Sequence, residues 1–390
     1  MKGIVLAGGT ATRLFPLTIV TNKHLLPIYD RPMIYYPIET LAGMGIREVL
    51  VIVGGKSVGD VVELLGDGRQ FGLDLTYRYQ RGAHGIAHGD IADATVVDPL
   101  VAEVDAVVNF AAESHVDRSI LDPEAFLVTG VIGVHVLLEA VRRERDRAAA
   151  GERTSAPRYV QVSTDEVYGS VPSGQSREDD ALAPRSPYSA AKAAGELLVR
   201  SYVVTHGIDA VVTRGSNTYG PYQHPEKLIP LFITNAIDDQ PLPLYGDGLQ
   251  RRDWLFVSDH AGAIEHVLRH GASGETYNLP GSVELTNRAV VAALLDRLAK
   301  PWSLVRTVAD RPGHDRRYAM DGSKLAAIGW RNRVPFDEGI ATTVDWFTAN
   351  DRWWRAVRSG EWDAYYARQY GARLAGSTAA EGPGPAPTAG

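Results

Sequence analysis

The sequence predicts an α/β fold, in which a doubly wound, mainly parallel sheet carries a smaller α/β substrate domain. Apolar runs rich in β-branched residues alternate with helical patterns for most of the chain. The second half is less regular and holds many proline and glycine residues, as expected of a smaller domain laid over the strand ends. A chain of 390 residues, 45% hydrophobic and 22% charged, can bury such a core.

In chain order, the predicted strands are residues 4–7, 49–53, 106–110, 159–163 and 210–213. Between them, residues 126–147 and 189–206 have helical patterns. Residues 371–390 are mostly Gly, Ala, Pro, Ser and Thr with few apolar anchors, so we expect a disordered tail there.

Composition excludes several classes of function. The formal net charge of -7 argues against nucleic-acid binding, which normally requires a basic excess. The absence of cysteine excludes disulfides and thiolate chemistry and fits a cytoplasmic protein. No run approaches the roughly 20 apolar residues that span a bilayer, so we expect no membrane partner. We also find no histidine and carboxylate spacing that suggests a metal site.

A glycine-rich turn follows the first predicted strand. Gly8 and Gly9 would let backbone N–H groups approach phosphate oxygens, while Arg13 and Lys23 would offset the phosphate charge. Taken alone, the glycine pair is better explained as a tight turn between a strand and a helix.

The longer string around this turn resembles the start of a glucose-1-phosphate thymidylyltransferase. It comprises residues 6–14 (LAGGTATRL), 16–18 (PLT) and 23–27 (KHLLP). Gln80 and Gly85 match the segment that reads the thymine base in that family, whereas Ala11 stands where the family usually has glycine. The resemblance ends near residue 87. Because the later segments that complete that family's active site have no counterpart, we do not expect nucleotidyltransferase activity.

Tyr188 directly precedes the predicted helix 189–206, and Lys192 lies four residues further along. At this spacing both side chains project from one face of a helix. An ammonium beside a phenol favours the phenolate and would lower the pKa of Tyr188 toward that of a useful base. A tyrosine and a lysine at this spacing are, by themselves, commonly a coincidence or surface decoration.

Three polar residues, Thr164, Asp165 and Glu166, follow the predicted strand 159–163. They therefore lie at the carboxyl end of a strand, where doubly wound folds place their sites. Adjacent carboxyl groups tend to separate their pKa values, so one can hold a proton while the other is ionised. The alternative is a turn or a helix cap, for which Thr and Asp are common.

From residue 88 to about 370 the chain resembles the dTDP-glucose 4,6-dehydratases of the extended short-chain dehydrogenase/reductase group. The strings that carry the resemblance are residues 88–91 (HGDI), 109–117 (NFAAESHVD), 163–169 (STDEVYG), 188–192 (YSAAK), 225–230 (PEKLIP), 252–254 (RDW) and 310–315 (DRPGHD). The resemblance implies a Rossmann-like sheet, NAD as cofactor, dTDP-glucose as substrate and a homodimer formed through residues 126–143 and 189–206.

The resemblance also implies a reaction. The catalytic residues would be Thr164, Asp165, Glu166, Tyr188 and Lys192. Tyr188 would take the proton of the glucose 4-hydroxyl, which Thr164 orients, while hydride passes from C4 to NAD. Glu166 would then abstract the C5 proton, Asp165 would protonate the departing 6-hydroxyl, and the hydride would return to C6. Because the cofactor is used twice in one turnover, it must stay bound throughout.

Further contacts follow from the same resemblance. The implied cofactor contacts, besides Tyr188 and Lys192, are Asp90, Ile91, Ala111, Ala112, Glu113, Ser114 and Thr129. The implied substrate contacts are His115, Asn217, Lys227, Leu228, Pro243, Tyr245, Arg252, Asn287, Asp310, Arg311 and His314. At another cofactor contact, Thr218 replaces the family's usual asparagine.

The glycine triplet G-x-x-G-x-x-G with which these dehydratases open is missing, and so is the acidic residue that holds the adenosine ribose. Residues 1–87 instead predict a β-α-β-α-β segment, ahead of a dehydratase body from 88 to 370. We expect this segment to fill the vacant sheet positions, with residues 73–79 near the place of the lost third strand, at a cost in NAD affinity. A natural fusion and an artefactual join near residues 85–87 would give the same sequence.

Three functions are therefore compared: a dehydratase, a catalytically impaired chimera that still binds nucleotide sugars, and a truncated thymidylyltransferase. A short-chain epimerase or dehydratase acting on another nucleotide sugar is the nearest rival among enzymes. Residues 165 and 166 discriminate within this group, since related epimerases carry other side chains there.

Overall fold

The computed structural model describes residues 2–7, 27–28, 31–32, 34–43, 45–54, 58–80, 91–311, 313–358 and 361–380. The glycine-rich turn at residues 8 and 9, the cations Arg13 and Lys23, and the expected cofactor contact Asp90 lie outside these ranges.

The N-terminal part is a small α/β unit. Its elements are β1 (Lys2–Ala7), β2 (Pro27–Ile28), β3 (Arg31–Pro32), α1 (Tyr35–Gly43), β4 (Glu48–Gly54), α2 (Val58–Leu65), the short 3-10 helix η4 (Arg69–Phe71) and β5 (Asp74–Gln80). Strands β1, β4 and β5 form a parallel sheet in that order, and β2 pairs with β3. Buried aliphatic residues of α1, β4, α2 and β5 form one small core of their own.

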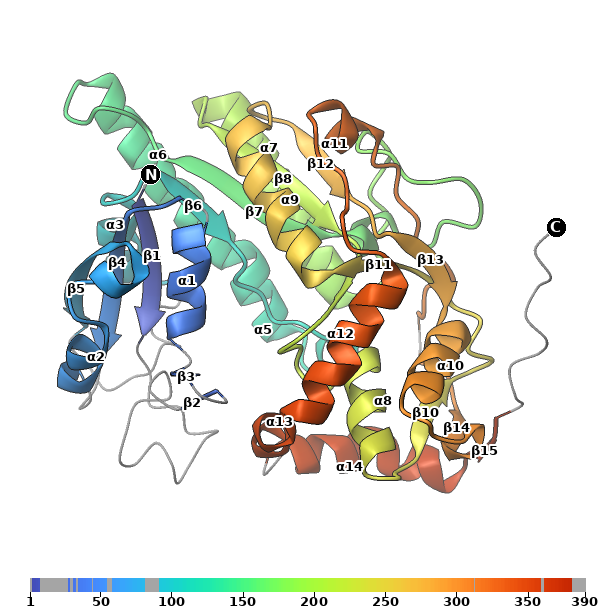
Figure 1. The fold of residues 1–390 in the computed structure, drawn as a ribbon. Coiled ribbons are helices and arrows are strands. Elements are labelled where there is room, and N and C mark those ends of the chain that lie inside the picture. The colour runs from blue at the N-terminus through green and yellow to red at the C-terminus, as the bar shows by residue number, and fades with distance from the viewer. Residues whose placement is uncertain are drawn as a thin grey trace.

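The central sheet of the body is parallel and four-stranded, in the order β12-β8-β7-β6. Its strands are β6 (Ala106–Asn109), β7 (Arg158–Thr164), β8 (Ala210–Gly215) and β12 (Thr276–Leu279). Helices α3 (Ala94–Val101), α6 (Val134–Ala149) and α7 (Pro187–His206) cover one face, and α9 (Val257–His270) and α11 (Ser323–Ala327) cover the other (Figure 1).

Alternate residues of one strand supply the two cores on either side of this sheet. Tyr159 packs with the helices on the first face, and its neighbour Val160 packs with those on the second. Both side chains are completely buried. Because side chains alternate along a strand, a strand covered on both faces is buried along its length, as six of the seven residues of β7 are.

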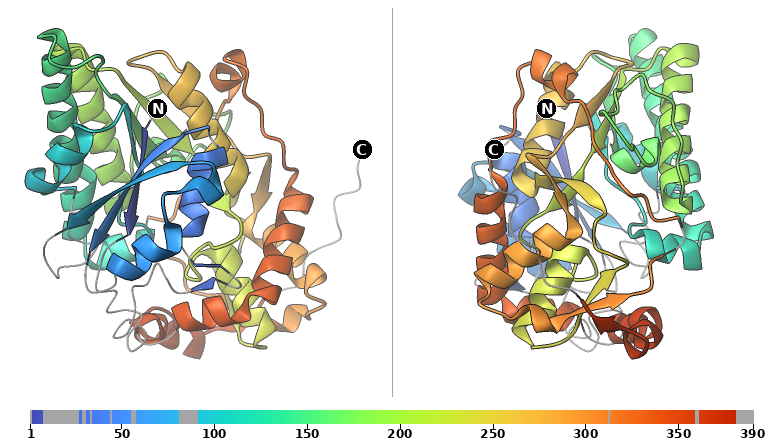
Figure 2. Two further views of the ribbon diagram at one scale, coloured as in Figure 1. Left: turned by 60° about the vertical axis from the view of Figure 1, so that its left-hand side comes forward. Right: turned by 90° about the vertical axis from the view of Figure 1, so that its right-hand side faces the viewer.

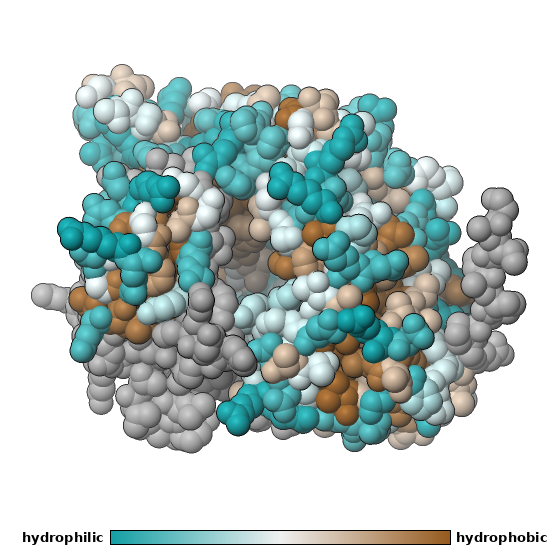
Figure 3. Space-filling model, viewed as in Figure 1, coloured by the Kyte–Doolittle hydropathy of each residue, from teal (hydrophilic) through white to brown (hydrophobic). Residues whose placement is uncertain are grey.

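The two parallel sheets do not join in the way we expected. The order β5-β4-β1 followed by β6-β7-β8 is that of a doubly wound sheet, but among the described strands none pairs β1 with β6. The expectation that the N-terminal segment completes the later sheet is therefore not met by strand pairing. In two views β1 lies on the side of β6 (Figures 1 and 2), and the surface is hollowed between this unit and the helices of the body (Figure 3).

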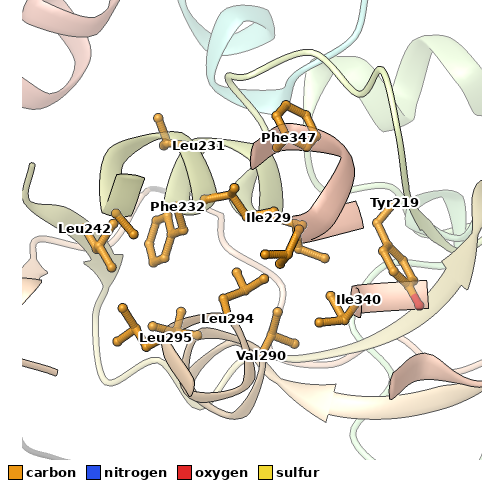
Figure 4. Close-up of a cluster of buried hydrophobic side chains, with 14 of the residues drawn as sticks. Tyr219, Ile229, Leu231, Phe232, Leu242, Val290, Leu294, Leu295, Ile340 and Phe347 are labelled. Atoms are coloured by element: carbon orange, nitrogen blue, oxygen red, sulfur yellow. The ribbon is translucent and has the colours of Figure 1, made fainter. Parts of the chain in front are cut away.

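A smaller substrate domain packs over the carboxyl ends of β7 and β8. Its strands are β9 (Asn217–Tyr219), β10 (Leu242–Tyr245), β11 (Arg251–Phe256), β13 (Val283–Thr286), β14 (Val305–Val308) and β15 (Thr378–Ala379), in two sheets ordered β13-β11-β9 and β10-β14-β15. Its helices are α8 (Leu228–Ile237), α10 (Asn287–Arg297), η8 (Trp302–Leu304), α12 (Phe336–Ala349), α13 (Asp351–Val357) and α14 (Glu361–Ala375). Figure 4 shows its core, where apolar side chains of α8, α10 and α12 meet.

The predicted helix 126–147 is one continuous helical run made of three parts. Helix α5 (Glu124–Leu127), the π-helical turn η6 (Val128–Gly133) and α6 follow without a break, after α4 (Val116–Leu121). Glycines 130 and 195 let η6 and α7 approach closely, since a Cβ on Gly195 would lie 2.8 Å from the backbone oxygen of Gly130. The run Glu124–Ala149 also meets the length and composition of a membrane span, contrary to our expectation that no segment would, although core helices of soluble proteins pass the same test.

The predicted tail is ordered over its first part. Helix α14 continues to Ala375, and β15 pairs antiparallel with β14. Trp302 also donates a hydrogen bond from Nε1 to the carbonyl oxygen of Ala380 at 3.1 Å. The expectation that disorder begins at residue 371 is therefore wrong for residues 371–380, because contacts with β14 and η8 stabilise a segment of weak intrinsic preference.

Candidate active site

Two cavities meet at the carboxyl ends of the central strands. The first, which we call the tyrosine cavity, has a volume of about 480 Å³ and contains Tyr188, Lys192, Thr164 and Asp165 in its wall. The second, the arginine cavity, has a volume of about 150 Å³ and contains Arg252 and Arg311. They share seven wall residues: His115, Val116, Glu166, Asn217, Lys227, Leu228 and Trp254. One ligand can therefore extend from one cavity into the other.

Helix α7 places Tyr188 and Lys192 in the tyrosine cavity. Ser186 caps the helix, accepting a hydrogen bond from the backbone N–H of Ser189 at 3.1 Å, and Pro187 occupies the first turn. The cap at Ser186 and the proline after it favour a helix that begins at Pro187, directly before Tyr188. Lys192, 7% exposed, donates a hydrogen bond from Nζ to the carbonyl oxygen of Val162 at 2.7 Å. The spacing of four residues thus brings both side chains to one cavity, as predicted.

The strand end of β7 continues directly into the short 3-10 helix η7 (Asp165–Tyr168). The hydroxyl oxygen of Thr164 accepts the backbone N–H of Glu166 at 3.3 Å, so Thr164 does cap this turn. Its hydroxyl also donates to Oδ1 of Asp165 at 3.1 Å. This one turn therefore contributes side chains to both cavities, since Asp165 lies in the wall of the tyrosine cavity and Glu166 lies in the walls of both.

Burial raises the pKa of both adjacent carboxyl groups. Burial, followed by the charges of Glu166 and Asp253, raises the pKa of Asp165 well above its usual value. Burial also raises the pKa of Glu166, but there Arg311, Lys227 and Arg252 act in the opposite direction. The Oδ2 atom of Asp165 has no partner within the described residues. Asp165 is thus suited to hold a proton and Glu166 to lose one.

The pKa of Tyr188 differs from our expectation. Burial and the charge of Glu166 raise it, while a hydrogen bond with Thr164 acts in the lowering direction. Lys192 does not contribute to this shift; burial lowers the pKa of Lys192 itself to about 8. The prediction that Lys192 lowers the pKa of Tyr188 is therefore wrong for this arrangement, because the ammonium group is directed to the backbone of β7.

Buried polar atoms without partners gather at the tyrosine cavity. Within the described residues they include Ser163 Oγ, Asp165 Oδ2, Asn217 Oδ1, Gln223 Oε1 and His260 Nε2, all from residues in its wall. Leaving buried polar groups unsatisfied costs about 1–3 kcal/mol each. Their concentration around one cavity is typical of a site whose ligand supplies the missing partners.

The predicted cofactor contacts are only partly brought together. Ala112 and Ser114 line the tyrosine cavity, with Tyr188 and Lys192. The other described members, Ile91, Ala111, Glu113 and Thr129, are absent from its wall. Ile91 instead packs beneath the π-helical turn η6, where a Cβ on Gly133 would lie 2.4 Å from its Cδ1 atom.

The predicted substrate contacts cluster in the arginine cavity. Its wall contains His115, Asn217, Lys227, Leu228, Pro243, Tyr245, Arg252, Asn287, Arg311 and His314. Asp310 is the exception, because it lies behind the wall and binds Nδ1 of His314 through Oδ1 at 2.5 Å. Side chains from seven different segments of the chain thus converge in one cavity.

Cationic and acidic side chains both line the arginine cavity. Lys227, Arg252 and Arg311 all line it, facing the carboxylates of Asp117 and Glu226. The guanidinium of Arg252 stacks over the ring of Tyr318 at 4.3 Å and donates to the carbonyl oxygen of Asp315 at 2.8 Å. Nε of Arg311 is buried and has no partner in the described part of the chain. A planar donor group fixed in this way is suited to a phosphate or diphosphate.

Sequence reasoning missed several residues in these walls. Asp117 and Glu226 stand inside quoted motifs but were not given a role, and Gln223 lies two positions before one of them. His260 carried no signal at all. It lines the tyrosine cavity, and its Nδ1 lies 2.8 Å from Oγ1 of Thr218, the residue that departs from the family pattern. Where the chain is described, no group of three or more metal-ligating side chains is found.

Comparison with known proteins divides the chain in two. Residues 73–343 match the family described as GDP-mannose 4,6 dehydratase, and residues 3–89 match the MobA-like NTP transferase domain. The dTDP-glucose 4,6-dehydratase of Streptomyces antibioticus is 51% identical over 271 residues, which cover 69% of this chain and 78% of that protein. The dTDP-glucose 4,6-dehydratase 1 of Escherichia coli K12 is 44% identical over 306 residues, covering 73% of this chain and 84% of that protein.

Solved structures agree. The dTDP-glucose 4,6-dehydratase of Streptomyces venezuelae, crystallised with NAD, is 41% identical, has a TM-score of 0.70, and is matched over 92% of this chain and 100% of its own. The UDP-glucose 4-epimerase of Thermus thermophilus, also crystallised with NAD, is 27% identical with a TM-score of 0.66, over 89% of this chain and 99% of its own. Because these dehydratases are more than 40% identical and the chain covers more than three quarters of their length, the chain belongs to the dTDP-glucose 4,6-dehydratase family, and its residues 3–89 match the MobA-like NTP transferase domain.

Proposed function

We propose that the protein converts dTDP-glucose to dTDP-4-keto-6-deoxyglucose and water, supplying deoxysugar biosynthesis. The observation that carries this proposal is the position of Asp165, Glu166 and Tyr188, which all line the tyrosine cavity, with Glu166 in the wall that it shares with the arginine cavity. A sugar placed at this junction would have an acid, a base and a phenol within one site. Its nucleotide would extend into the arginine cavity.

The side chains divide the proton transfers among them. Tyr188, hydrogen-bonded to Thr164, takes the proton of the sugar 4-hydroxyl as the phenolate, so the pKa of this phenol, which burial raises, must fall when the ligands bind. A ketone at C4 makes the C5 hydrogen acidic, and Glu166 removes it. Asp165, held neutral by burial, gives its proton to the 6-hydroxyl, which leaves C6 as water. Once C6 has received hydride, C5 takes back a proton. The proton lost from the 4-hydroxyl and the hydroxide lost from C6 then account for the water released.

NAD is the cofactor of this proposal, and it supplies the site with a group that accepts hydride from C4 and returns it to C6. The residues present fit its nicotinamide half, because the tyrosine cavity is lined by Tyr188, Lys192 and residues that carry buried polar atoms without partners within the described part of the chain. The other half of such a site would involve residues 81–90 and the turn after β1, which lie outside the described ranges. The missing glycine triplet and the break between β1 and β6 lead us to expect weak NAD binding.

The test is incubation of the purified chain with dTDP-glucose at increasing NAD concentrations, with product followed by mass spectrometry. We expect product that increases with added NAD, and at least about 100-fold slower turnover by the Asp165→Asn and Tyr188→Phe variants. The Arg368→Ala variant, which changes an exposed residue of α14, is the matched control and should retain full turnover. UDP-glucose and GDP-mannose in parallel reactions identify the base that is accepted.

A second candidate is a nucleotide-sugar-binding chimera with little catalytic activity, which the break between the two sheets favours. It predicts a folded protein that binds dTDP but forms no product at any NAD concentration. A third, thymidylyl transfer, predicts pyrophosphate release from dTTP and glucose 1-phosphate. The N-terminal match covers residues 3–89 alone, and we expect no such release.

The proposal includes a homodimer in the cytoplasm. Large exposed apolar side chains occur on the adjacent elements α4, α5, η6 and α7: Ile120, Leu121, Leu127, Val128, Ile132, Leu197 and Val204. Such a concentration on neighbouring helices is typical of a protein interface. Sedimentation should therefore give a dimer for the wild type and a monomer for Leu197→Asp, with Leu249→Asp, outside these elements, as the control. A chain without cysteine fits a reducing compartment, and cell fractionation tests this location.

A further inference from the structure

Helix α14 lies against the arginine cavity, although the motifs that build the cavity are far away in the sequence. In Figure 1 the helix runs along the lower edge of the molecule, beneath α8. Tyr365, Gln369, Tyr370 and Arg373 are spaced so that they share one side of the helix. Tyr370 is 4% exposed and forms part of the cavity wall.

Tyr245 is another residue of the cavity wall, and its hydroxyl forms hydrogen bonds with Gln369, Arg373 and Asp117. The oxygen accepts hydrogen bonds from Nε2 of Gln369 at 2.9 Å and from a guanidinium nitrogen of Arg373 at 2.5 Å. The hydroxyl hydrogen is donated to Oδ2 of Asp117 at 3.2 Å. A phenol has one hydrogen to donate and two lone pairs. The hydroxyl of Tyr245 is therefore fully used within the protein, and only its ring is left to contact a ligand.

The ring of Tyr245 is also held in a fixed orientation. The guanidinium of Arg373 lies 5.0 Å from the ring centroid, and the rings of His314 and Tyr370 lie 6.1 Å and 6.2 Å away. An aromatic ring that cannot rotate forms a flat wall. Such a wall is suited to stacking with a planar base.

A second contact from α14 reaches the junction of the two cavities. The hydroxyl of Tyr365 lies 3.2 Å from Nδ1 of His115, and the two rings meet edge to face at 5.9 Å. His115 has a backbone φ of 89°, in the left-handed region that residues other than glycine rarely adopt. The guanidinium of Arg118 stacks over the ring of Tyr365, 4.5 Å from its centroid. Helix α14 thus helps to hold His115 in a strained position in the wall of both cavities.

The helix is itself fixed to the substrate domain. Asn235 of α8 donates a hydrogen bond to the hydroxyl of Tyr366 at 3.1 Å and accepts one from Arg358 at 2.9 Å. Trp362 and Tyr370 belong to the same core as α8, α10 and α12. A movement of α14 away from the cavity would therefore disrupt buried contacts.

We infer that α14 is a positioning element for nucleotide recognition: Gln369 and Arg373 hold the ring of Tyr245 as the wall against which the base of a nucleoside diphosphate stacks. This inference rests on the proposed function, because it assumes that the arginine cavity receives the nucleotide end of the substrate. Gln369 and Arg373 do not touch the ligand; they act through Tyr245.

The test measures dTDP and NAD binding separately by calorimetry on the full chain. Arg373→Ala should weaken dTDP binding about tenfold, since it removes a charge-assisted hydrogen bond and the stacked cation, and Gln369→Ala should weaken it about threefold. Neither change should alter NAD affinity. Arg368→Ala removes an exposed arginine from the same helix and should leave both affinities unchanged. In turnover, Arg373→Ala should raise KM while kcat changes less than about twofold.

A double-mutant cycle gives the decisive result. If Arg373 acts through the hydroxyl of Tyr245, then Arg373→Ala should weaken dTDP binding much less in a Tyr245→Phe background than in the wild type. Additive losses would overturn the inference, and so would unchanged dTDP binding by both single variants or an equal loss of NAD binding. If the wild type binds dTDP and the variants follow the expected pattern without any turnover, the inference stands and the proposed function fails. If turnover by the wild type is normal and the variants bind dTDP as the wild type does, the proposed function stands and the inference fails.

Discussion

Replacing Asp165 by asparagine should make the protein more stable and far less active. The side chain is 4% exposed, and its Oδ2 atom has no partner within the described residues. Burial and the charges of Glu166 and Asp253 all raise its pKa. Asparagine has nearly the same shape and keeps an oxygen that can accept the hydrogen bond from Thr164, but it carries no charge at any pH.

The sign of the effect follows from proton binding. An acid whose pKa is raised by folding binds more protons in the folded state, so its contribution to stability falls as pH rises from about 4 through the folded-state pKa. Each unit of difference is equivalent to about 1.4 kcal/mol. Because asparagine does not ionise, the variant does not lose stability in this way as the pH rises. We expect the two proteins to be equally stable near pH 4 and the variant to gain about 1–3 kcal/mol in free energy of unfolding by pH 8.

Urea unfolding followed by circular dichroism between pH 4 and pH 8 measures this difference. Turnover of dTDP-glucose by the same variant should fall about 10²–10⁴-fold, because the leaving hydroxyl loses its proton donor. The kcat of the wild type should decrease on the alkaline side as Asp165 loses its proton. If the stability difference between the two proteins is the same at every pH, then Asp165 does not have a raised pKa. Its assignment as the proton donor would then lack its physical basis.

Three other changes test the site and its support. Tyr188→Phe should lower kcat at least about 100-fold without changing dTDP affinity, as measured by calorimetry, because it removes a proton acceptor and keeps the ring. Gly195→Ala should cost about 1–3 kcal/mol in unfolding free energy, since the new methyl group would meet a backbone oxygen at 2.8 Å; Gly371→Ala, with open space around it, should cost nothing. Glu196→Gln should cost about 3 kcal/mol at neutral pH, because it leaves the buried Arg214, now paired at 2.7 Å, without a counterion. A smaller loss than 1 kcal/mol would mean that Arg214 finds enough compensation in its other hydrogen bonds.

The break between the two parallel sheets has a consequence for the cofactor. In doubly wound folds a dinucleotide lies across the carboxyl ends of both halves of one sheet. Here the half that holds Tyr188 and Lys192 is well formed, but β1 does not pair with β6 among the described strands. Weak NAD binding, rather than altered chemistry at Asp165 and Glu166, is therefore the expected effect of the N-terminal exchange.

Local patterns in the sequence were sufficient to predict five of the strands, the helices over residues 126–147 and 189–206, and the polar turn after β7. The apolar run before Thr164 predicted β7, and the spacing of Tyr188 and Lys192 predicted that they share a helix face. These features depend on backbone periodicity and on capping, which act over a few residues. Ten of the substrate contacts expected from the motifs also line one cavity.

Only the tertiary structure decided how distant groups act on one another. It placed Tyr365 beside His115, 250 residues earlier in the chain, and it ordered a segment whose composition predicted disorder. It also buried Tyr188 beside Glu166, which raises the pKa of the phenol, and it directed the ammonium group of Lys192 to the backbone of β7. Burial, hydrogen-bond partners and electrostatic distances are set by packing between elements, and no pattern of nearby residues contains them.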